Sequence, residues 1–419
     1  MTTGRQQRIG EAARQPRWQA FRGGVTSPRG FLAATAMAGL RTNPAPDLAL
    51  LVVAGGPGSA AAVFTTNRFK AAPVIVAQRN LATSGGRVRA VVVNAGCANA
   101  GTGAAGIEDA VRVVEEVASA IGCPPEQVFP ASTGLIGSRL PVPVMQRAVR
   151  RLRPSGSRAA GRRAARAIMT TDTRPKEAAV RVHLGDGRAV TVAGMAKGAG
   201  MIHPQLATML AFVTTDAPVA DELLQRLLGP VVDDTFNQVT VDGDASTNDC
   251  VLLVSSGALP GPPIGGGDDA TALSDGLRAV CRSLARQIAA DGEGARTLIQ
   301  VVVAGARDTR DARTVARTVA GSNLVKAAVH GADPNWGRIA AAAGRSGAEL
   351  DPDRLRVQVG PVVVYDGAPR PFDPERASAA LSGRVAAIRL DLGLGDGSAE
   401  AWGCDLSAEY VAINSEYST

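Results

Sequence analysis

Short aliphatic runs, bounded by glycine and asparagine, recur along the whole chain. Their length and their branched side chains are typical of β-strands. The predicted strands cover residues 48–53, 60–64, 88–93, 189–193, 251–254, 299–304 and 357–365.

Segments between these strands carry apolar residues at helical spacing. The predicted helices cover residues 107–121, 144–152, 159–169, 220–228, 272–290 and 311–319. Strands and helices mix at irregular intervals, which favours a layered α+β fold over a Rossmann or barrel arrangement. Residues 257–269 hold three prolines and five glycines and are predicted to form a surface loop.

Length and composition indicate a globular protein with two or three folding units. The chain has 419 residues, of which 45% are apolar and 20% charged. No uninterrupted apolar run reaches the roughly 18 residues that a membrane-spanning helix needs. We therefore expect no membrane partner.

Arginine is concentrated in two places. The first 22 residues hold five arginines and one acid, and no apolar stretch follows that could direct secretion, so residues 1–23 are predicted to be a basic disordered leader. Residues 147–166 hold eight arginines and no acid. Because no aromatic residues are interleaved with them, this block is interpreted as a solvated helix face, and no nucleic-acid partner is expected.

Cysteine and histidine place further limits on the chemistry. The five cysteines are widely and unequally spaced, which predicts neither a disulfide framework nor a metal site and fits a cytoplasmic location. The three histidines are His183, His203 and His330. No G-x-S-x-G motif is present, so conventional serine hydrolase chemistry is not expected.

Three glycine-rich or acidic segments fail as ligand motifs. Residues 55–59 lack the Gly-Lys-Ser/Thr of a phosphate-binding loop. Residues 242–249 begin like a calcium loop, but Thr247 stands where the sharp turn needs glycine. Residues 393–397 have the wrong spacing for a dinucleotide fingerprint.

One segment is different in kind. Residues 197–210 read Lys-Gly-Ala-Gly-Met-Ile-His-Pro-Gln-Leu-Ala-Thr-Met-Leu, and Thr208 stands at the head of the apolar run 209–213. This text resembles the ornithine acetyltransferase (glutamate N-acetyltransferase) family, whose members cleave themselves before a threonine in a K-G-x-G-M-I-x-P-x-x-A-T-M-L context. Without that resemblance, the segment is a loop that enters a buried strand.

Further segments resemble the same family in the same order, from about Gly24 to the last residue. They are residues 131–137, 167–176, 235–249, 291–295, 333–338 and 410–419. The resemblance implies a layered α/β/β/α sandwich with a smaller C-terminal subdomain. It also implies cleavage between Ala207 and Thr208, which would leave an α chain with folded residues 24–207 and a β chain of residues 208–419.

The residue type at the cleavage site suits this chemistry. A threonine hydroxyl is a weak nucleophile that needs a base, and an N-terminal threonine carries its own in a free amine with a pKa of about 8. The resemblance implies that Thr208 takes an acetyl group from N-acetylornithine and passes it to glutamate in arginine biosynthesis. Such a reaction proceeds by ping-pong kinetics.

The resemblance also assigns the rest of the site. The Thr133 hydroxyl and the Gly134 amide would form the oxyanion hole. The substrate-binding residues would be Thr171, Lys197, Thr208, Glu293, Asn414 and Thr419. A lysine ammonium suits an α-carboxylate, and a glutamate suits the side-chain ammonium of ornithine. No metal or cofactor is expected, acetyl-CoA stays open as an alternative donor, and two αβ units would form an α2β2 heterotetramer.

Four places depart from the family pattern and leave the acyl donor and acceptor open. They are Cys97, Gln205-Leu206, Arg296-Thr297 and Ser322-Asn323. One alternative is a paralogue that acts on another acyl-amino acid, and a second is a self-cleaving amidohydrolase or aminopeptidase. A non-enzymatic basic scaffold is supported only by the two arginine blocks. Some motif residues are as compatible with a structural role and are left out of the site: Asp242, Asn248, Asp333, Trp336 and Arg338.

Overall fold

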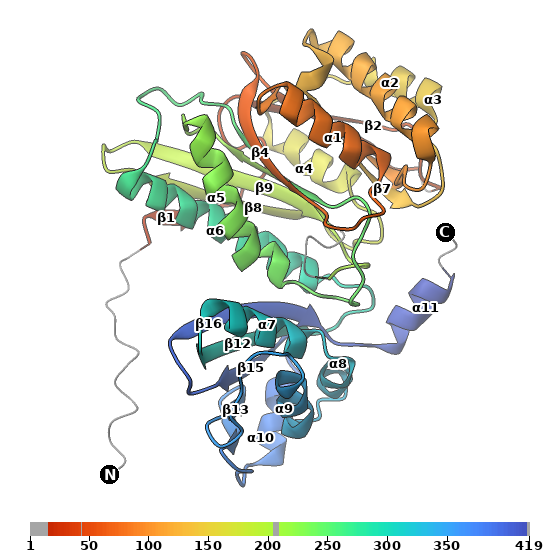
Figure 1. Ribbon diagram of the computed structural model, residues 1–419. Coiled ribbons are helices and arrows are strands. Elements are labelled where there is room, and N and C mark those ends of the chain that lie inside the picture. Colours follow the sequence, from red (N-terminus) through yellow and green to blue (C-terminus); the bar gives the residue numbers. More distant parts are fainter. Residues whose placement is uncertain (1–15, 43, 204–208, 417–419) are drawn as a thin grey trace.

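The computed structural model describes residues 16–416 except residues 43 and 204–208. Two stacked sheets with their helices form the upper part of the molecule, and a third sheet with its own helices forms the lower part (Figure 1). In the part of the chain so described, no helix is long and apolar enough to cross a membrane.

The largest sheet has seven strands in the order β1-β8-β9-β10-β11-β4-β5. These are β1 (Trp18–Ala20), β4 (Gly58–Phe64), β5 (Arg87–Val88), β8 (Lys176–His183), β9 (Ala189–Lys197), β10 (Leu210–Thr215) and β11 (Cys250–Ser255). Helices α5 (Asp221–Asp234) and α6 (Gly267–Ala289) cover its outer face, where Leu224 and Leu284 belong to one buried cluster with Val213.

The second sheet has four strands in the order β2-β3-β6-β7. These are β2 (Phe31–Ala36), β3 (Leu48–Val53), β6 (Ala90–Cys97) and β7 (Val128–Leu135). On its outer side lie α2 (Gly103–Ile121) and α3 (Val142–Val149), while α1 (Ala72–Thr83) packs beside β7 and α2, and a 3-10 turn, η1 (Pro125–Gln127), precedes β7.

The two sheets share a core. Phe31, Leu51 and Phe129 of the four-stranded sheet are buried together with Phe212 and Leu252 of the seven-stranded sheet. Because helices cover both outer faces, the predicted α/β/β/α sandwich is confirmed, and with it the α+β class.

The C-terminal part is the predicted smaller unit. Its five strands are ordered β14-β13-β15-β12-β16, namely β12 (Leu298–Ala306), β13 (Arg356–Val359), β14 (Val362–Asp366), β15 (Val385–Asp391) and β16 (Gly397–Cys404). Its helices are α7 (Thr309–Ala320), α8 (Asn323–His330), α9 (Trp336–Gly344) and α10 (Pro374–Leu381). A last helix, α11 (Ala408–Glu416), runs back toward the upper part (Figure 1).

A buried lysine joins the two parts. Lys326 of α8 is only 2% exposed and donates to the carbonyl of Val241, which follows the 3-10 turn η2 (Phe236–Gln238) of the upper part. The Val241 amide in turn donates to the carbonyl of Ile202 at 2.7 Å. The lower part is therefore tied directly to the loop that follows β9.

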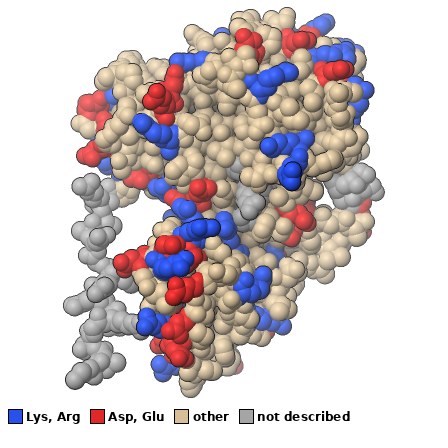
Figure 2. Space-filling model, in the orientation of Figure 1, with Lys and Arg blue, Asp and Glu red and all other residues tan. Residues whose placement is uncertain are grey.

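The arginine block folds as its composition indicates. It includes α4 (Arg158–Ala167), which buries Ala160, Ala164 and Ala165 in the core between the sheets and leaves its arginines exposed. Figure 2 shows basic and acidic side chains interspersed over one face of the molecule. The interpretation as a solvated helix face holds for the four arginines of α4, whereas Arg150, Arg151 and Arg153 are exposed in the segment between α3 and α4.

Three local predictions are corrected by the structure. Residues 357–365 form two strands, β13 and β14, because the chain turns at Gly360, whose φ is +53°. Residues 88–93 are shared between β5 and β6, which belong to different sheets. Trp18–Ala20, assigned to the disordered leader, pair with β8, whereas residues 1–15 lie outside the described residues.

Candidate active site

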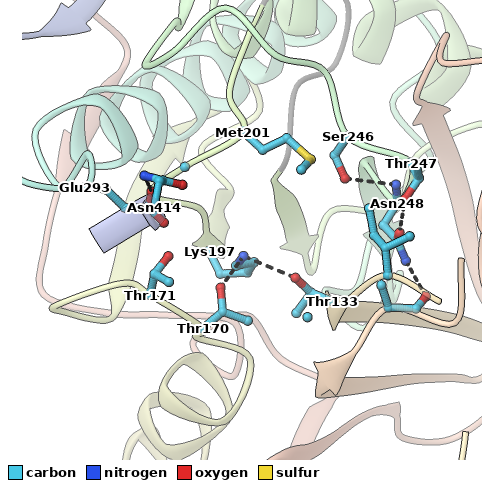
Figure 3. A pocket seen from close by; sticks show the side chains of 14 residues that line it. Thr133, Thr170, Thr171, Lys197, Met201, Ser246, Thr247, Asn248, Glu293 and Asn414 are labelled. Carbon is cyan, nitrogen blue, oxygen red and sulfur yellow. Dashed lines mark hydrogen bonds between the residues drawn. The ribbon is translucent and has the colours of Figure 1, made fainter. Parts of the chain in front are cut away.

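A pocket of about 190 Å³ lies where the ends of β7 and β9 meet the loop after α6 and the helix α11 (Figure 3). Six of the residues predicted from the sequence line it: Thr133, Gly134, Thr171, Lys197, Glu293 and Asn414. They span 281 positions of the chain and come from both sides of the predicted cleavage point. The fold therefore gathers all the predicted site residues that the structure describes.

Lys197 is the last residue of β9 and is only 3% exposed. Its Nζ donates to the Thr170 hydroxyl at 2.7 Å and to the Thr133 hydroxyl at 3.2 Å (Figure 3). Burial lowers the pKa of Lys197, although nearby carboxylates, Asp172 foremost, oppose that effect.

Asp172 ties its own loop to the residue that follows Lys197. Its Oδ1 accepts from the Gly198 amide at 2.7 Å and from the buried Lys176 ammonium at 2.6 Å, and its Oδ2 accepts from the Thr170 amide at 3.0 Å. Burial alone would raise the pKa of Asp172, but the charges of Lys197 and Lys176 outweigh it and lower the pKa to about 2. Asp172 is thus an ionised anchor for the loop that carries the site threonines.

Thr133 and Gly134 stand at the end of β7, where the pairing with β6 becomes irregular. Gly134 has φ +130°, and a Cβ there would lie 2.3 Å from the carbonyl carbon of Gly96. Only glycine fits this close approach of two backbones. The preceding residue, Ser132, accepts through its carbonyl from Asn248 Nδ2 at 2.9 Å, which holds the end of β7 in place.

Glu293 and Asn414 form the opposite side of the pocket (Figure 3). Asn414 Nδ2, on α11, donates to Glu293 Oε2 at 2.9 Å. The Glu293 amide donates to the carbonyl of Ala199 at 2.9 Å, and a Cβ on Gly200 would lie 2.4 Å from the Glu293 carboxylate. The glycines after Lys197 therefore leave room for an acidic side chain at the pocket.

Three predicted residues lie outside the described residues: Ala207, Thr208 and Thr419. The structure describes the residue that follows Thr208. The Met209 amide donates to Asp249 Oδ1 at 2.9 Å. Met209 precedes Leu210, whose partner across the β9–β10 pair is Lys197.

Asp249 is a buried acid beside this strand. Only 1% of it is exposed, and its Oδ2 has no hydrogen-bond partner among the residues that the structure describes. Burial raises the pKa of Asp249 well above its ordinary value, against the opposing effects of the Met209 amide and Lys197.

Sequence reasoning missed several pocket residues. Thr170, Met201, Ser246, Thr247 and Asn248 line the pocket beside the predicted set. A signal existed for most of them, because they stand inside segments that resemble the family. Nothing in the sequence, however, indicated that Thr170 would line the pocket together with the predicted Thr171.

The motif residues left out of the site divide into two groups. Asn248 lines the pocket, and Asp242 accepts from the amides of Met201 and Ile202 at 2.5 and 2.8 Å. Met201 has φ +56°, so these bonds hold a strained turn at the rim of the pocket. Asp333, Trp336 and Arg338 lie at or within α9 of the C-terminal part and do not line the pocket.

The described part of the pocket offers hydroxyl, ammonium, amide and carboxylate groups, and no histidine or cysteine lines it. Among the described residues, no cluster of three or more His, Cys, Asp or Glu could hold a metal ion. Burial raises the pKa of Cys97, so this departure from the family pattern adds an unreactive thiol.

The sequence and the fold were compared with known proteins. The ArgJ family model matches residues 32–419. The arginine biosynthesis bifunctional protein ArgJ of Dehalococcoides mccartyi is 48% identical over 400 residues, covering 95% of this chain and 98% of that protein. The protein of the same name from Thermosynechococcus vestitus is 47% identical over 419 residues, covering 96% and 99% of the two chains.

A solved structure is also similar. A crystallised chain of the arginine biosynthesis bifunctional protein ArgJ from Bacillus halodurans is 42% identical, covers 49% of this chain and 98% of its own, and has a TM-score of 0.48. The family match and the full-length relatives place the protein plainly: the chain belongs to the ArgJ family.

Proposed function

We propose that this protein is a self-cleaving acetyltransferase of arginine biosynthesis, which moves acetyl from N-acetylornithine to glutamate through an acetyl ester on Thr208. A second activity would acetylate glutamate from acetyl-CoA, in keeping with the bifunctional name of the relatives. The observation that carries the proposal is the meeting of six residues, predicted independently of the fold, in one pocket.

Cleavage at Ala207–Thr208 would give a folded α chain of residues 24–207 and a β chain of residues 208–419. The arrangement of the seven-stranded sheet supports lasting association of the two chains. Strands β10 and β11, which would belong to the β chain, lie between β9 and β4 of the α chain. The cut would fall in a connection between paired strands, so it would break no strand pairing. We expect two αβ units to associate as an α2β2 heterotetramer in the cytoplasm.

In the cleavage step, the Thr208 hydroxyl attacks the carbonyl of Ala207. The acyl group moves from nitrogen to oxygen, the nitrogen takes the proton that the hydroxyl loses, and water then hydrolyses the ester to a carboxylate on Ala207. The freed α-amine, with a pKa of about 8 in an unperturbed terminus, becomes the base for later turnovers.

In the transfer step, the same hydroxyl attacks the acetyl carbonyl of N-acetylornithine, and the ornithine amine leaves with a proton. The oxyanion that forms needs donors aimed at it. The Thr133 hydroxyl accepts a hydrogen bond from Lys197, so its own hydrogen remains free to donate to the oxyanion beside the Gly134 amide. Lys197 thereby acts as a positioning residue for Thr133.

Substrate recognition would fall to the opposite side of the pocket. The Glu293 carboxylate, held by Asn414, faces the place where the side-chain ammonium of ornithine would lie. Thr171 lines the same pocket. Thr419, which the resemblance assigns to substrate binding, is also proposed to contact the substrate.

The test begins with the intact mass of the purified protein under denaturing conditions. We expect two masses that meet at Ala207 and Thr208, and a single mass from Thr208→Ala. Thr271→Ala, an exposed threonine on α6, is the control and should be cleaved as fully as wild type. An uncleaved wild-type protein would contradict the proposed nucleophile.

The acyl donor and acceptor need their own assay. Acetyl released from N-acetylornithine should appear on glutamate, with parallel lines in a double-reciprocal plot as the sign of ping-pong kinetics. Release of acetate at a rate that glutamate does not change would instead favour the self-cleaving amidohydrolase. Transfer confined to other amino acids would favour the paralogue.

A further inference from the structure

A second, larger cavity of about 480 Å³ adjoins the candidate active site. Thr171 and Glu293 line both this cavity and the first pocket, so these two residues border both spaces. Its walls come from the loop before β8, the loop between α6 and β12, the start of β15, and α11. It therefore lies at the junction of the upper and lower parts of the molecule.

Three arginines line this cavity: Arg174, Arg296 and Arg384. Arg174 donates to the carbonyl of Ala290 at 3.2 Å and lies 3.7 Å from Asp291. For the guanidinium groups of Arg296 and Arg384, the structure shows no hydrogen bond or ion pair to any residue that it describes. Two cations thus remain available to an incoming anion.

Three acids share the lining with the three arginines, and no ion pair among the described residues joins one of these acids to Arg296 or Arg384. Asp291 is buried, and its Oδ2 is bonded at 2.6 Å to the fully buried Lys176, which it shares with Asp172. Glu293 is turned toward Asn414 at the first pocket. Among the described residues of the lining, Glu409 on α11 is the third carboxylate.

We propose that this arginine-lined cavity binds the phosphate groups of acetyl-CoA while the acetyl thioester reaches the first pocket past Thr171 and Glu293. Arginine forks match the geometry of phosphate oxygens, and a cavity larger than the first pocket suits a carrier larger than an amino acid. The acetyl would pass to the Thr208 hydroxyl, and coenzyme A would leave as the thiol with the proton of that hydroxyl. This inference rests on the proposed function.

The test compares two donors on one enzyme. N-acetylornithine carries no phosphate, whereas acetyl-CoA does, so the double variant Arg296→Gln/Arg384→Gln should raise the KM for acetyl-CoA by about tenfold or more. The KM for N-acetylornithine and the KM for glutamate should stay near wild type, which also shows that the variant folds. Arg389→Gln, an exposed arginine farther along β15, is the matched control and should change neither reaction.

Two further probes separate phosphate binding from acyl chemistry. Adenosine 3′,5′-bisphosphate should compete with acetyl-CoA in the wild type and lose about tenfold in potency in the double variant. S-acetyl-N-acetylcysteamine, a thioester without phosphate, should be used equally well by both proteins.

The outcomes that overturn the inference are distinct. An unchanged KM for acetyl-CoA in the double variant would show that Arg296 and Arg384 do not bind acetyl-CoA. An equal rise in the KM for glutamate with both donors would assign them to the acceptor carboxylate instead. Wild-type turnover of N-acetylornithine without any turnover of acetyl-CoA would overturn this inference and leave the proposed transfer standing, whereas loss of both reactions would mean that the proposed function has failed.

Discussion

Lys197 Nζ lies 3.2 Å from Thr133 Oγ1; Lys197 ends β9 and Thr133 lies near the end of β7, in a different sheet. Thr133 belongs to the four-stranded sheet and Lys197 to the seven-stranded sheet. The hydrogen bond therefore spans the sandwich at the point where its two layers open into the pocket. In the proposed mechanism, these two separately predicted residues would form one unit, a hydroxyl donor and the cation that orients it.

This relationship predicts the effect of removing Lys197. In Lys197→Met, the apolar stem stays and the donor is lost, so Thr133 can turn away from the oxyanion. We expect kcat to fall by about 100- to 1000-fold, the cost of losing an oxyanion donor, with a smaller change in KM. Lys70→Met, a lysine outside the pocket, serves as control, and steady-state kinetics with N-acetylornithine measure both. If KM changed and kcat did not, the result would indicate that Lys197 binds substrate, as predicted from the sequence, and does not position Thr133.

Gly134 and Gly137 form a second matched pair. Both have positive φ, +130° and +89°, but a Cβ on Gly134 meets backbone at 2.3 Å, whereas a Cβ on Gly137 meets nothing within 4 Å. Gly137→Ala should cost roughly 1 to 2 kcal/mol from backbone strain alone. Gly134→Ala should destabilise the protein more and abolish transfer, because β6 and β7 must separate. Urea unfolding and the transfer assay together check this, and equal effects would contradict it.

Glu293→Gln should weaken recognition of the donor's ammonium. The amide oxygen of the new side chain can still accept from Asn414, so the pocket keeps its shape. We expect the KM for N-acetylornithine to rise about tenfold or more and selectivity over donors without an ammonium to disappear. Glu375→Gln on α10 is the control. Unchanged selectivity would refute the assignment of Glu293.

Asp249 should behave as a neutral acid. Since its pKa is raised in the folded protein, wild-type stability should fall as pH rises from about 4 toward that pKa. In Asp249→Asn, the side-chain oxygen can still accept from the Met209 amide, but the group no longer titrates. The stability of this variant should therefore not fall with pH in this way, and it should increase relative to wild type as pH rises. Asp249→Ala leaves the amide unpaired and should cost about 1 to 3 kcal/mol. Denaturant unfolding across pH measures these differences; a steep loss of stability in Asp249→Asn near neutral pH would indicate a charged carboxylate instead.

Asp172 should show the opposite dependence on pH. Its pKa is lowered to about 2 in the folded protein, so its stabilising effect is complete above the unfolded pKa of about 3.9 and is lost as pH falls from there to about 2. At neutral pH, Asp172→Asn should cost about 3 to 5 kcal/mol, because it removes one partner of the buried Lys176. Glu116→Gln, which breaks an exposed ion pair with Arg150, should have a much smaller effect. Equal effects in thermal unfolding would show that the buried network contributes little.

The sequence alone determined which residues could do the chemistry. Short aliphatic runs located most strands, such as Leu48–Val53, which is β3, and helical spacing located most helices, because both signals are local in the sequence. Ordered motifs identified the ArgJ family and six residues of one pocket before any fold was known. Thr208, Ala207 and Thr419 remain predictions from the sequence.

The contacts between these residues follow from the folded arrangement of the chain. The hydrogen bond from Lys197 to Thr133 joins positions 64 residues apart, and Thr170, which has the same side chain as Thr171, receives the other bond from Lys197. The pairing of β10 with β9, the Asp249 oxygen that has no partner among the described residues, and the arginine-lined cavity likewise arise where distant segments pack together. Local patterns cannot encode such contacts, because burial and charge balance at each group depend on neighbours that the fold supplies from elsewhere in the chain.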